Sequence, residues 1–357
     1  MREIARRLGV SRPAVSAALS DRPYTIALSG ALRERIRRAA AEMGYRRNVL
    51  AQSFIKQRST LVGFLGRREY FLYALETLGG IESVLDAKGY STLAFLHGDT
   101  PEDQWRHLQR CLDRRVDGLI VAGAPEGPRG RVTRLIGELR KKGFPLVQVY
   151  RRTFPGVPVV MVDDTRIGAL QTAHLIGLGH ARIAHYTHDG YLARERPVQD
   201  RDARERYEGY AQAMREAGLE PEAVTFPVGR YFPLAGGYAP GAASEAARLL
   251  GRPARFTAAV CFNDYVALGL LKGARALGRR VPGNLSIVGY DDVDFSRASE
   301  PPLTTLAPPI RDIGREAAAR ILGLIGGRPA DDLILEPELR VRGTTTTAQA
   351  GSGKPEA

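Results

Sequence analysis

The spacing of apolar residues divides the chain into two regions of different character. In the first sixty residues apolar positions recur at helical spacing in three short stretches, within residues 4–8, 15–19 and 32–43. Gly9 follows the first stretch and tolerates the left-handed conformation that ends a helix. Ser11 is placed to cap the second helix, with Pro13 in its first turn, and the third begins near Ser29. Two short helices joined by a glycine-containing turn and supported by a third predict a helix-turn-helix.

From Leu61 onward short apolar runs alternate with helical segments. The first series of predicted strands covers residues 61–66, 91–96, 117–123, 144–150 and 157–162, and the second covers 182–187, 223–228, 258–262 and 285–290. The predicted helices cover residues 74–88, 103–115, 206–217, 241–250, 264–277 and 311–326. Strands that alternate with helices indicate parallel sheets covered on both faces. Two successive series therefore predict an α/β core with two lobes.

The charge is concentrated in the first region. The 357-residue chain has a net charge of +13, and residues 1–60 hold 13 basic and four acidic side chains, a net of +9. The rest of the chain carries only +4, so the acidic partner that this charge implies belongs to the small N-terminal segment. Two distant cysteines, Cys111 and Cys261, indicate neither a disulfide scaffold nor a zinc site. The charged start and the lack of a long apolar run predict a cytoplasmic protein without membrane contact.

The second helix is the candidate for reading DNA in the major groove. Arg12, Pro13, Ser16 and Ala17 are its first residues expected to be exposed. Arg12 is suited to the O6 and N7 acceptors of a guanine, although a phosphate contact is the alternative, and Pro13 and Ala17 offer only apolar contact. A generic three-helix cap with a solvated basic face is the competing interpretation. No capping residue precedes Arg2, which predicts either a fraying first turn or a start further upstream.

Several segments resemble the LacI/GalR family of bacterial repressors. They are VSRPAVSAALS (10–20), GYRRNVLAQSFIKQRS (44–59), LGHARIA (178–184), FNDYVALGLLKGARALGRRVPGNLSIVGYDD (262–292), PPLTTL (301–306) and ELRVRG (338–343). The resemblance implies a helix-turn-helix headpiece over residues 1–46, a hinge helix over 47–59 and a periplasmic-binding-protein-like core over 60–343. We expect residues 344–357 to form a flexible tail.

The resemblance also assigns DNA contacts to the hinge, where Asn48, Gln52 and Phe54 are the candidates. In the family a leucine from each hinge wedges into a base step at the operator centre. Here that position holds Phe54, which is another side chain used as a wedge. The alternative is that Phe54 packs on a dimer mate or on the core. The family often has arginine at the position of Ala17, so the operator sequence is expected to differ.

The resemblance places a ligand between the lobes. Arg206, Asn263 and Asp291 match family residues that contact the ligand, and their donors and acceptors suit hydroxyl groups. Phe232, or Tyr231, lies near an aromatic position of the family, Asp164 is a further candidate, and Tyr150 stands where the family often has aspartate. Each has a simpler interpretation: Asn263 and Asp264 as helix caps, Asp291 as a turn residue and Arg206 as a surface charge.

Together these features predict a dimeric, ligand-responsive transcription factor, expected to be a repressor of carbohydrate or related small-molecule metabolism. Its partners would be palindromic operator DNA, a sugar-like effector and a second copy of the chain, since the tail lacks a leucine heptad for tetramers. The sequence contains no nucleotide-binding or hydrolase motif, and His180, His185 and His188 lack metal-ligand spacing. We therefore expect no enzyme activity, cofactor or metal. A transport-type sugar-binding protein and an α/β enzyme with a basic arm are the alternatives.

Overall fold

The computed structural model describes residues 1–19, 28–45, 58–68, 71–98, 100–123, 130–188, 201–226 and 256–349. The chain forms two compact units, Met1–Ser59 and Thr60–Ala357. The predicted helix over residues 241–250 lies outside the described residues, as do Asn48, Gln52, Phe54, Tyr231 and Phe232. Among the described helices, none is long and apolar enough to span a membrane.

The N-terminal unit contains three described helices, α1 (Arg2–Leu8), α2 (Arg12–Ala18) and α3 (Gly30–Glu42). Gly9 has a φ of 65° and ends α1, as its lack of a Cβ allows. The Ser11 hydroxyl accepts a hydrogen bond from the Ala14 amide at 3.2 Å and caps α2. Ile4, Val15 and Ile36, one from each helix, are buried in a shared core. The predicted three-helix arrangement is therefore present.

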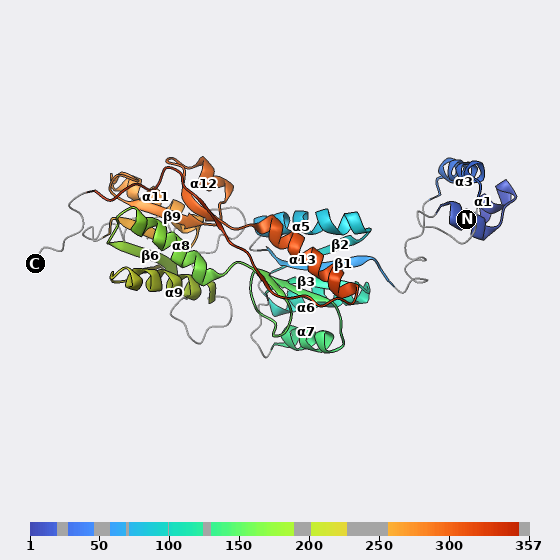
Figure 1. Ribbon diagram of the computed structural model, residues 1–357, viewed down its shortest axis with the longest axis horizontal. Helices are drawn as coiled ribbons and strands as arrows, with labels where there is room; N and C mark the ends of the chain where they lie inside the picture. The colour runs from blue at the N-terminus through green and yellow to red at the C-terminus, as the bar shows by residue number, and fades with distance from the viewer. Residues whose placement is uncertain are drawn as a thin grey trace, which may run out of the picture. The chain divides into compact units, whose positions relative to one another are not determined.

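The second unit has two lobes, each built on a six-stranded sheet (Figure 1). The sheet of the first lobe, here called the N-lobe, is parallel and runs in the order β11-β5-β4-β3-β1-β2. Its elements are β1 (Leu61–Arg67), α5 (Phe71–Leu85), a 3-10 turn (Asp86–Lys88), β2 (Ser91–His97), α6 (Pro101–Asp113), β3 (Gly118–Ala122), α7 (Arg131–Lys141), β4 (Leu146–Val149), β5 (Val159–Met161), α13 (Ile310–Ile325) and β11 (Leu333–Ile334).

The C-lobe sheet runs in the order β12-β10-β9-β8-β6-β7, with only β12 antiparallel to its neighbour. Its elements are α8 (Asp164–Gly177), β6 (Ile183–His188), α9 (Arg201–Glu216), β7 (Glu222–Phe226), β8 (Ala258–Cys261), α11 (Asp264–Ala276), β9 (Ser286–Tyr290), α12 (Asp294–Ala298), β10 (Thr304–Ala307) and β12 (Glu338–Arg340). The predicted two-lobed α/β class with parallel sheets is confirmed.

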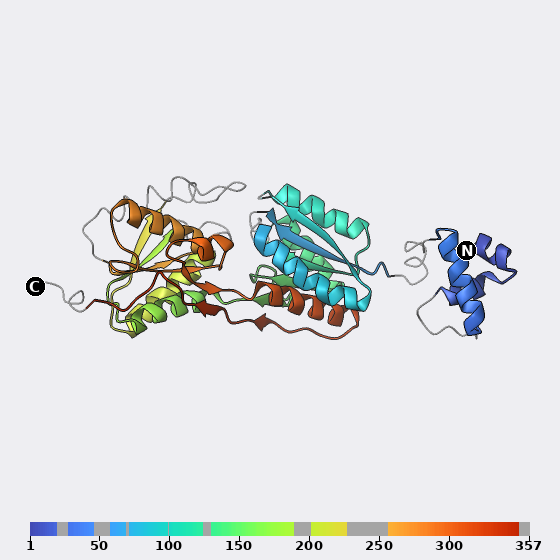
Figure 2. The same ribbon diagram turned by 90° about the horizontal axis from the view of Figure 1, so that it is seen from above.

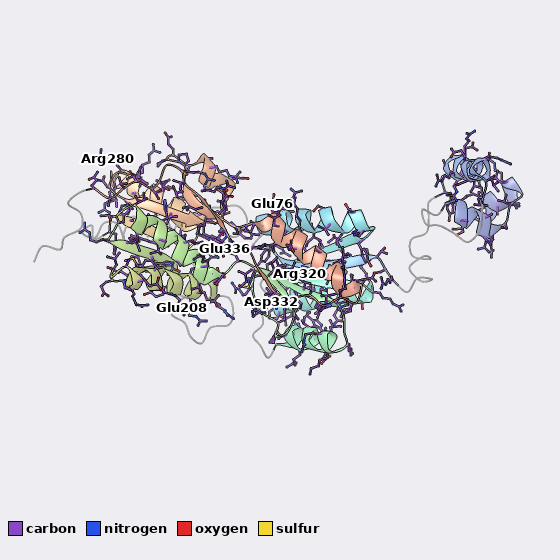
Figure 3. All side chains as sticks on the ribbon, in the orientation of Figure 1. Glu76, Glu208, Arg280, Arg320, Asp332 and Glu336 are labelled. Carbon is purple, nitrogen blue, oxygen red and sulfur yellow. The ribbon has the colours of Figure 1, made fainter. Side chains whose placement is uncertain are left out.

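Three segments connect the lobes, between β5 and α8, between β10 and α13, and between β11 and β12. The second of these returns the chain to the N-lobe, where α13 packs beside α5 although more than 200 residues separate them (Figures 1 and 2). Asp332 directly precedes β11, and Glu336 lies within the third segment; both are labelled in Figure 3. They pair with Arg152 at 2.6 Å and with Arg166 at 3.5 Å. These pairs are exposed, so we expect them to contribute little to stability.

Each lobe contains a pair of helices that cross in direct backbone contact at glycines. In the C-lobe a Cβ added to Gly168 of α8 would lie 1.9 Å from the carbonyl oxygen of Arg206 on α9. A Cβ added to Gly209 of α9 would lie 1.8 Å from the carbonyl oxygen of Thr165 on α8. Gly80 of α5 and Gly314 of α13 form the equivalent crossing in the N-lobe. Only glycine allows helices to approach this closely, and the C-lobe crossing sets the positions of Asp164 and Arg206.

The segment after Arg342 differs from the prediction. The flexible tail was expected to begin at Thr344, but Thr344 is buried and its hydroxyl donates to the Ile287 carbonyl oxygen at 2.7 Å. His180 Nε2 lies 3.0 Å from the Thr346 carbonyl oxygen and 3.0 Å from Ser286 Oγ. The threonines satisfy buried polar groups of the C-lobe sheet, so residues 344–346 form part of the fold.

Candidate functional site

The polar residues of the candidate ligand site follow the carboxyl ends of strands. Asn263 follows β8 after Phe262, Asp291 follows β9 directly, and Tyr150 follows β4 in the other lobe. Open α/β sheets bind ligands beyond this edge, because successive loops converge there. The two lobes therefore present the same edge of their sheets, and helices α8 and α9 supply Asp164 and Arg206 to the group.

Arg206 is a deeply enclosed charged residue of this group, with 8% of its surface exposed. Its Nε donates to Asp164 Oδ1 at 2.8 Å, and its Nη1 donates to the Phe262 carbonyl oxygen at 2.7 Å. The guanidinium lies 4.6 Å from the ring centroid of Phe262 and 4.2 Å from that of Tyr290. Salt bridge, backbone acceptor and aromatic rings together fix the side chain in one orientation.

The surroundings keep Arg206 charged. Burial alone would lower the pKa of Arg206, but Asp164 and other nearby acidic groups raise that pKa above its usual value. The interpretation of Arg206 as a surface helix charge is therefore wrong. A buried guanidinium paired with one carboxylate is a fixed array of donors beside the strand ends.

Asp291 has a backbone conformation and a bonding partner that a turn residue alone does not explain. Its φ is 122°, which is unusual for a residue with a side chain. The hydroxyl of Tyr73, on α5 of the N-lobe, donates a hydrogen bond to Asp291 Oδ1. Burial raises the pKa of Asp291 to about 7, although Arg206 acts in the opposite direction. The Asp291 carboxyl group can therefore hold a proton near neutral pH.

Asp264 positions the turn that carries Asp291. Its carboxylate accepts hydrogen bonds from the Val293 amide at 3.0 Å and from Thr305 Oγ1 at 2.5 Å. A Cβ added to Gly289 would lie 2.2 Å from Asp264 Oδ1, so glycine is required beside this carboxylate. Burial raises the pKa of Asp264 to about 6. The helix cap predicted for this pair is supplied by Asn263, whose Oδ1 accepts from the Val266 amide at 3.1 Å.

Tyr150 lies on the N-lobe side of the group. Its backbone φ is 69°, and its hydroxyl lies 2.5 Å from Thr77 Oγ1 and 3.3 Å from the Tyr73 carbonyl oxygen. Its ring meets that of Tyr73 edge to face, with 6.0 Å between the centroids. Tyr150 thus packs against the helix that carries Tyr73, and the structure brings it to the same edge as the other candidates.

Sequence reasoning missed three contributors to this group. Tyr73 contacts Asp291 from the opposite lobe, and no motif marks it. Gln171 on α8 donates to the carbonyl oxygens of Cys261 at 3.0 Å and Gly289 at 2.8 Å, which ties α8 to the ends of β8 and β9. Arg151 pairs with Asp202 at 2.8 Å, again between the lobes. Each of these contacts joins residues that are far apart in the sequence, so no local motif marks them.

The headpiece surface agrees with most of the predicted exposure. Arg12 and Pro13 at the start of α2 are exposed, and Ser16 is partly exposed. Ala17 was expected to face DNA, but only 1% of its surface is exposed, so this expectation is wrong. The side chain of Ala17 ends at Cβ and is too short to reach the surface of the headpiece. Arg12 is therefore the strongest hydrogen-bond donor among the predicted contacts on α2.

The chain thus combines a helical N-terminal unit with a two-lobed core whose strand ends bring polar side chains together. The family profile of the periplasmic binding protein-like domain matches residues 172–345. The HTH-type transcriptional regulator MalR of Streptomyces coelicolor is 31% identical over 99% of this chain and 98% of its own length. The chain belongs to the LacI/GalR family of transcriptional regulators.

Solved structures show the same fold. The lac repressor dimer bound to operator and an anti-inducer has a TM-score of 0.78 and 24% identity, and the match covers 96% of this chain and 98% of that one. The complex of the regulator CelR with cellobiose has a TM-score of 0.63 and 27% identity, with the same coverage. The chain is thus a DNA-binding transcriptional regulator, and the expectation that it is not an enzyme is confirmed by these relatives.

Proposed function

We propose that this regulator binds an uncharged, hydroxyl-rich ligand between its core lobes and that this ligand changes the affinity of its headpiece for operator DNA. The observation that supports the proposal best is the pairing of fixed donors and acceptors at the strand ends. Arg206 is held by Asp164 and two aromatic rings, and Asp291 stands beside it with a partner from the other lobe. A ligand that contacts both lobes favours the arrangement in which the lobes are close.

The charge balance of the described residues favours an uncharged ligand. Arg206 and Arg151 are the two guanidiniums of this group, whereas Asp164, Asp202 and Asp291 supply three carboxyl groups. Both guanidiniums are already paired with carboxylates at 2.8 Å. A phosphorylated ligand would have to compete with these carboxylates in a poorly hydrated site. A sugar or polyol needs only donors, acceptors and an apolar face.

The DNA-binding half of the proposal concerns residues that the resemblance assigns. Arg12 would contact a base or phosphate of each half-site, and Asn48, Gln52 and Phe54 would act at the operator centre. A homodimer would place two headpieces on a palindromic operator, since the symmetry of such sites follows that of the protein. We propose a repressor that acts in the cytoplasm, where its DNA target is located.

A thermal-shift screen tests the ligand half directly. The full chain is heated with free sugars, polyols and nucleosides and, in parallel, with the phosphate ester of each sugar. A ligand at one hundred times its Kd stabilises the native state by about 2.7 kcal/mol, which is measurable. We expect at least one neutral compound to raise the Tm and its phosphate ester to have no effect. Stabilisation by phosphate esters alone would contradict the proposed ligand class.

Each stabilising compound is then added to the chain bound to operator DNA. The proposal requires a change in DNA affinity, in either direction, and an equal factor in the affinity of that compound measured with and without DNA. Asp291→Asn is the site variant, and Asp294→Asn is its matched control on the exposed start of α12. A ligand response that survives in Asp291→Asn at full strength would remove Asp291 from the site.

A further inference from the structure

A direct hydrogen bond joins the two lobes at the centre of the candidate ligand site. Tyr73 lies on α5 of the N-lobe, and its hydroxyl donates a hydrogen bond to Oδ1 of Asp291, which follows β9 of the C-lobe. Burial raises the pKa of Tyr73 well above its usual value, so this hydroxyl keeps its proton and is the donor. The same carboxylate is the acceptor that the proposed function assigns to a ligand hydroxyl.

The N-lobe holds Tyr73 firmly in this position. Tyr150 meets the ring of Tyr73 edge to face at 6.0 Å, and its hydroxyl lies 3.3 Å from the Tyr73 carbonyl oxygen. Thr77, one turn further along α5, lies within hydrogen-bond distance of the same Tyr150 hydroxyl. The glycine crossing of α5 with α13 at Gly80 fixes the helix itself. Tyr73 therefore reaches Asp291 from a rigid support.

A second contact joins the lobes nearby. Arg151, the residue after Tyr150, pairs with Asp202 at 2.8 Å, and both side chains are mostly buried. Asp202 lies on α9, four residues before Arg206, so both contacts involve the elements that form the candidate site. Breaking either contact removes an interaction between a carboxyl group of the C-lobe and a side chain of the N-lobe.

We propose that Tyr73 is an internal competitor of the ligand: its hydroxyl occupies Asp291 and holds the lobes together until a ligand hydroxyl takes its place. This inference rests on the proposed ligand site. Tyr73 then sets the affinity and the selectivity of the site for its ligand. A ligand hydroxyl can bind the Asp291 carboxylate only by displacing the hydrogen bond from Tyr73. The Arg151–Asp202 pair keeps the lobes aligned during the exchange.

The test measures the distance between the lobes in the full chain. Glu138 on α7 and Glu216 on α9 are exposed and lie in different lobes, so cysteines placed there carry spin labels. The native cysteines, Cys111 and Cys261, are buried and are not expected to react. Labelled chain is mixed with excess unlabelled chain so that only distances within one chain are read.

Tyr73→Phe removes the hydroxyl and keeps the ring. The measurement is made at about pH 8, where Asp291 is mostly ionised. Loss of a hydrogen bond to a charged group then corresponds to a factor of about 10 or more, so the population at longer distances should rise by about that factor. Tyr90→Phe, in the same lobe after α5, is the control and should leave the distribution unchanged. An unchanged distribution in Tyr73→Phe would overturn the proposal.

The competition is read with cellobiose, D-ribose and D-glucose as probes. Any of these that binds should bind Tyr73→Phe about 10-fold more tightly than the parent chain, since Asp291 is released. Weaker binding would mean that Tyr73 contacts the sugar, and it would overturn the competition. If none of the three binds either chain, and the wider screen also finds no ligand, the proposed function fails; the distance measurement still decides whether Tyr73 holds the lobes together.

Discussion

Replacing Arg206 by methionine tests whether this residue is a buried partner of Asp164. Arg206→Met keeps much of the side-chain length but leaves Asp164 buried without its cation. Arg206 is 8% exposed, and its contact with Asp164 is a 2.8 Å charge-assisted hydrogen bond. Breaking a buried pair by removing one partner costs about 3–5 kcal/mol, because an uncompensated charge remains. For a lobe of this size that loss lowers the Tm by about 6–20 °C.

The assay is thermal and urea-induced unfolding of the full chain, followed by tyrosine fluorescence. Arg204→Met is the matched control, since Arg204 lies on the same helix and its pairing with Glu208 at 3.8 Å is exposed. We expect the control to change the free energy of unfolding by less than about 0.5 kcal/mol. The pair variant Arg206→Met with Asp164→Leu removes both charges and should recover most of the loss.

Two results would refute this reasoning. Equal effects of Arg206→Met and Arg204→Met would mean that Arg206 is not a buried partner of Asp164. A pair variant no more stable than Arg206→Met would mean that the cost is lost packing and not an unpaired carboxylate. A lost ligand response in an Arg206 variant is therefore informative only after the fold of that variant is verified.

Three further predictions concern other parts of the chain. The pKa of Asp291 is about 7 in the fold and near 3.9 when unfolded, so proton binding to Asp291 favours the native state as the pH falls. In urea titrations the free energy of unfolding of the parent chain, relative to that of Asp291→Asn, should rise by on the order of 4 kcal/mol from pH 8 to pH 4. Parallel pH profiles of the two chains would contradict this. Gly209→Ala should be strongly destabilising in thermal unfolding, whereas Gly137→Ala on α7, with open space around its Cα, should be neutral or stabilising; equal effects would refute the helix crossing. Phe54→Ala should weaken specific operator binding more than nonspecific binding in gel-shift titrations, and equal losses would exclude a wedge.

The sequence was sufficient for strands β1 to β9, whereas β10, β11 and β12 were not predicted. Residues 61–66, 91–96 and 285–290 were predicted as strands, and the structure has strands there with ends within one residue. Such strands are apolar on both faces because helices cover both sides of the sheet, so the pattern is continuous and easily recognised. The caps of the headpiece helices were equally visible, since Ser11 and Gly9 act locally.

Helix α8 shows why other elements were missed. Only Ile167 and Leu175 of its six buried residues have apolar side chains, so no continuous apolar stripe marks the buried face. Gly168 is there because the backbone of α9 lies against it, and Gln171 because two strand ends need a donor. A pattern of apolar residues detects burial of apolar surface, whereas much of the buried face of α8 makes backbone contacts and hydrogen bonds.

The candidate site likewise contains residues that the sequence predicts and residues that it does not. Arg206 and Asp291 were identified by resemblance to family motifs, and the structure brings them together beside Asp164. Tyr73 could not be found, because its partner lies 218 residues further along the chain and in the other lobe. A single sequence does not encode such pairings in a local pattern. Residues that join the lobes are therefore the part of the site that required a structure.

We expect the full chain to recognise an operator through its basic N-terminal unit. The most direct test of this recognition selects DNA from a random pool with the full chain and then measures affinity for the recovered sequence between 50 and 200 mM salt. We predict an inverted repeat in the recovered DNA and, for about six to ten phosphate contacts, a loss of affinity of about 10³–10⁵-fold over this range of salt. Recovered DNA without an inverted repeat, or an affinity that does not change with salt, would contradict it.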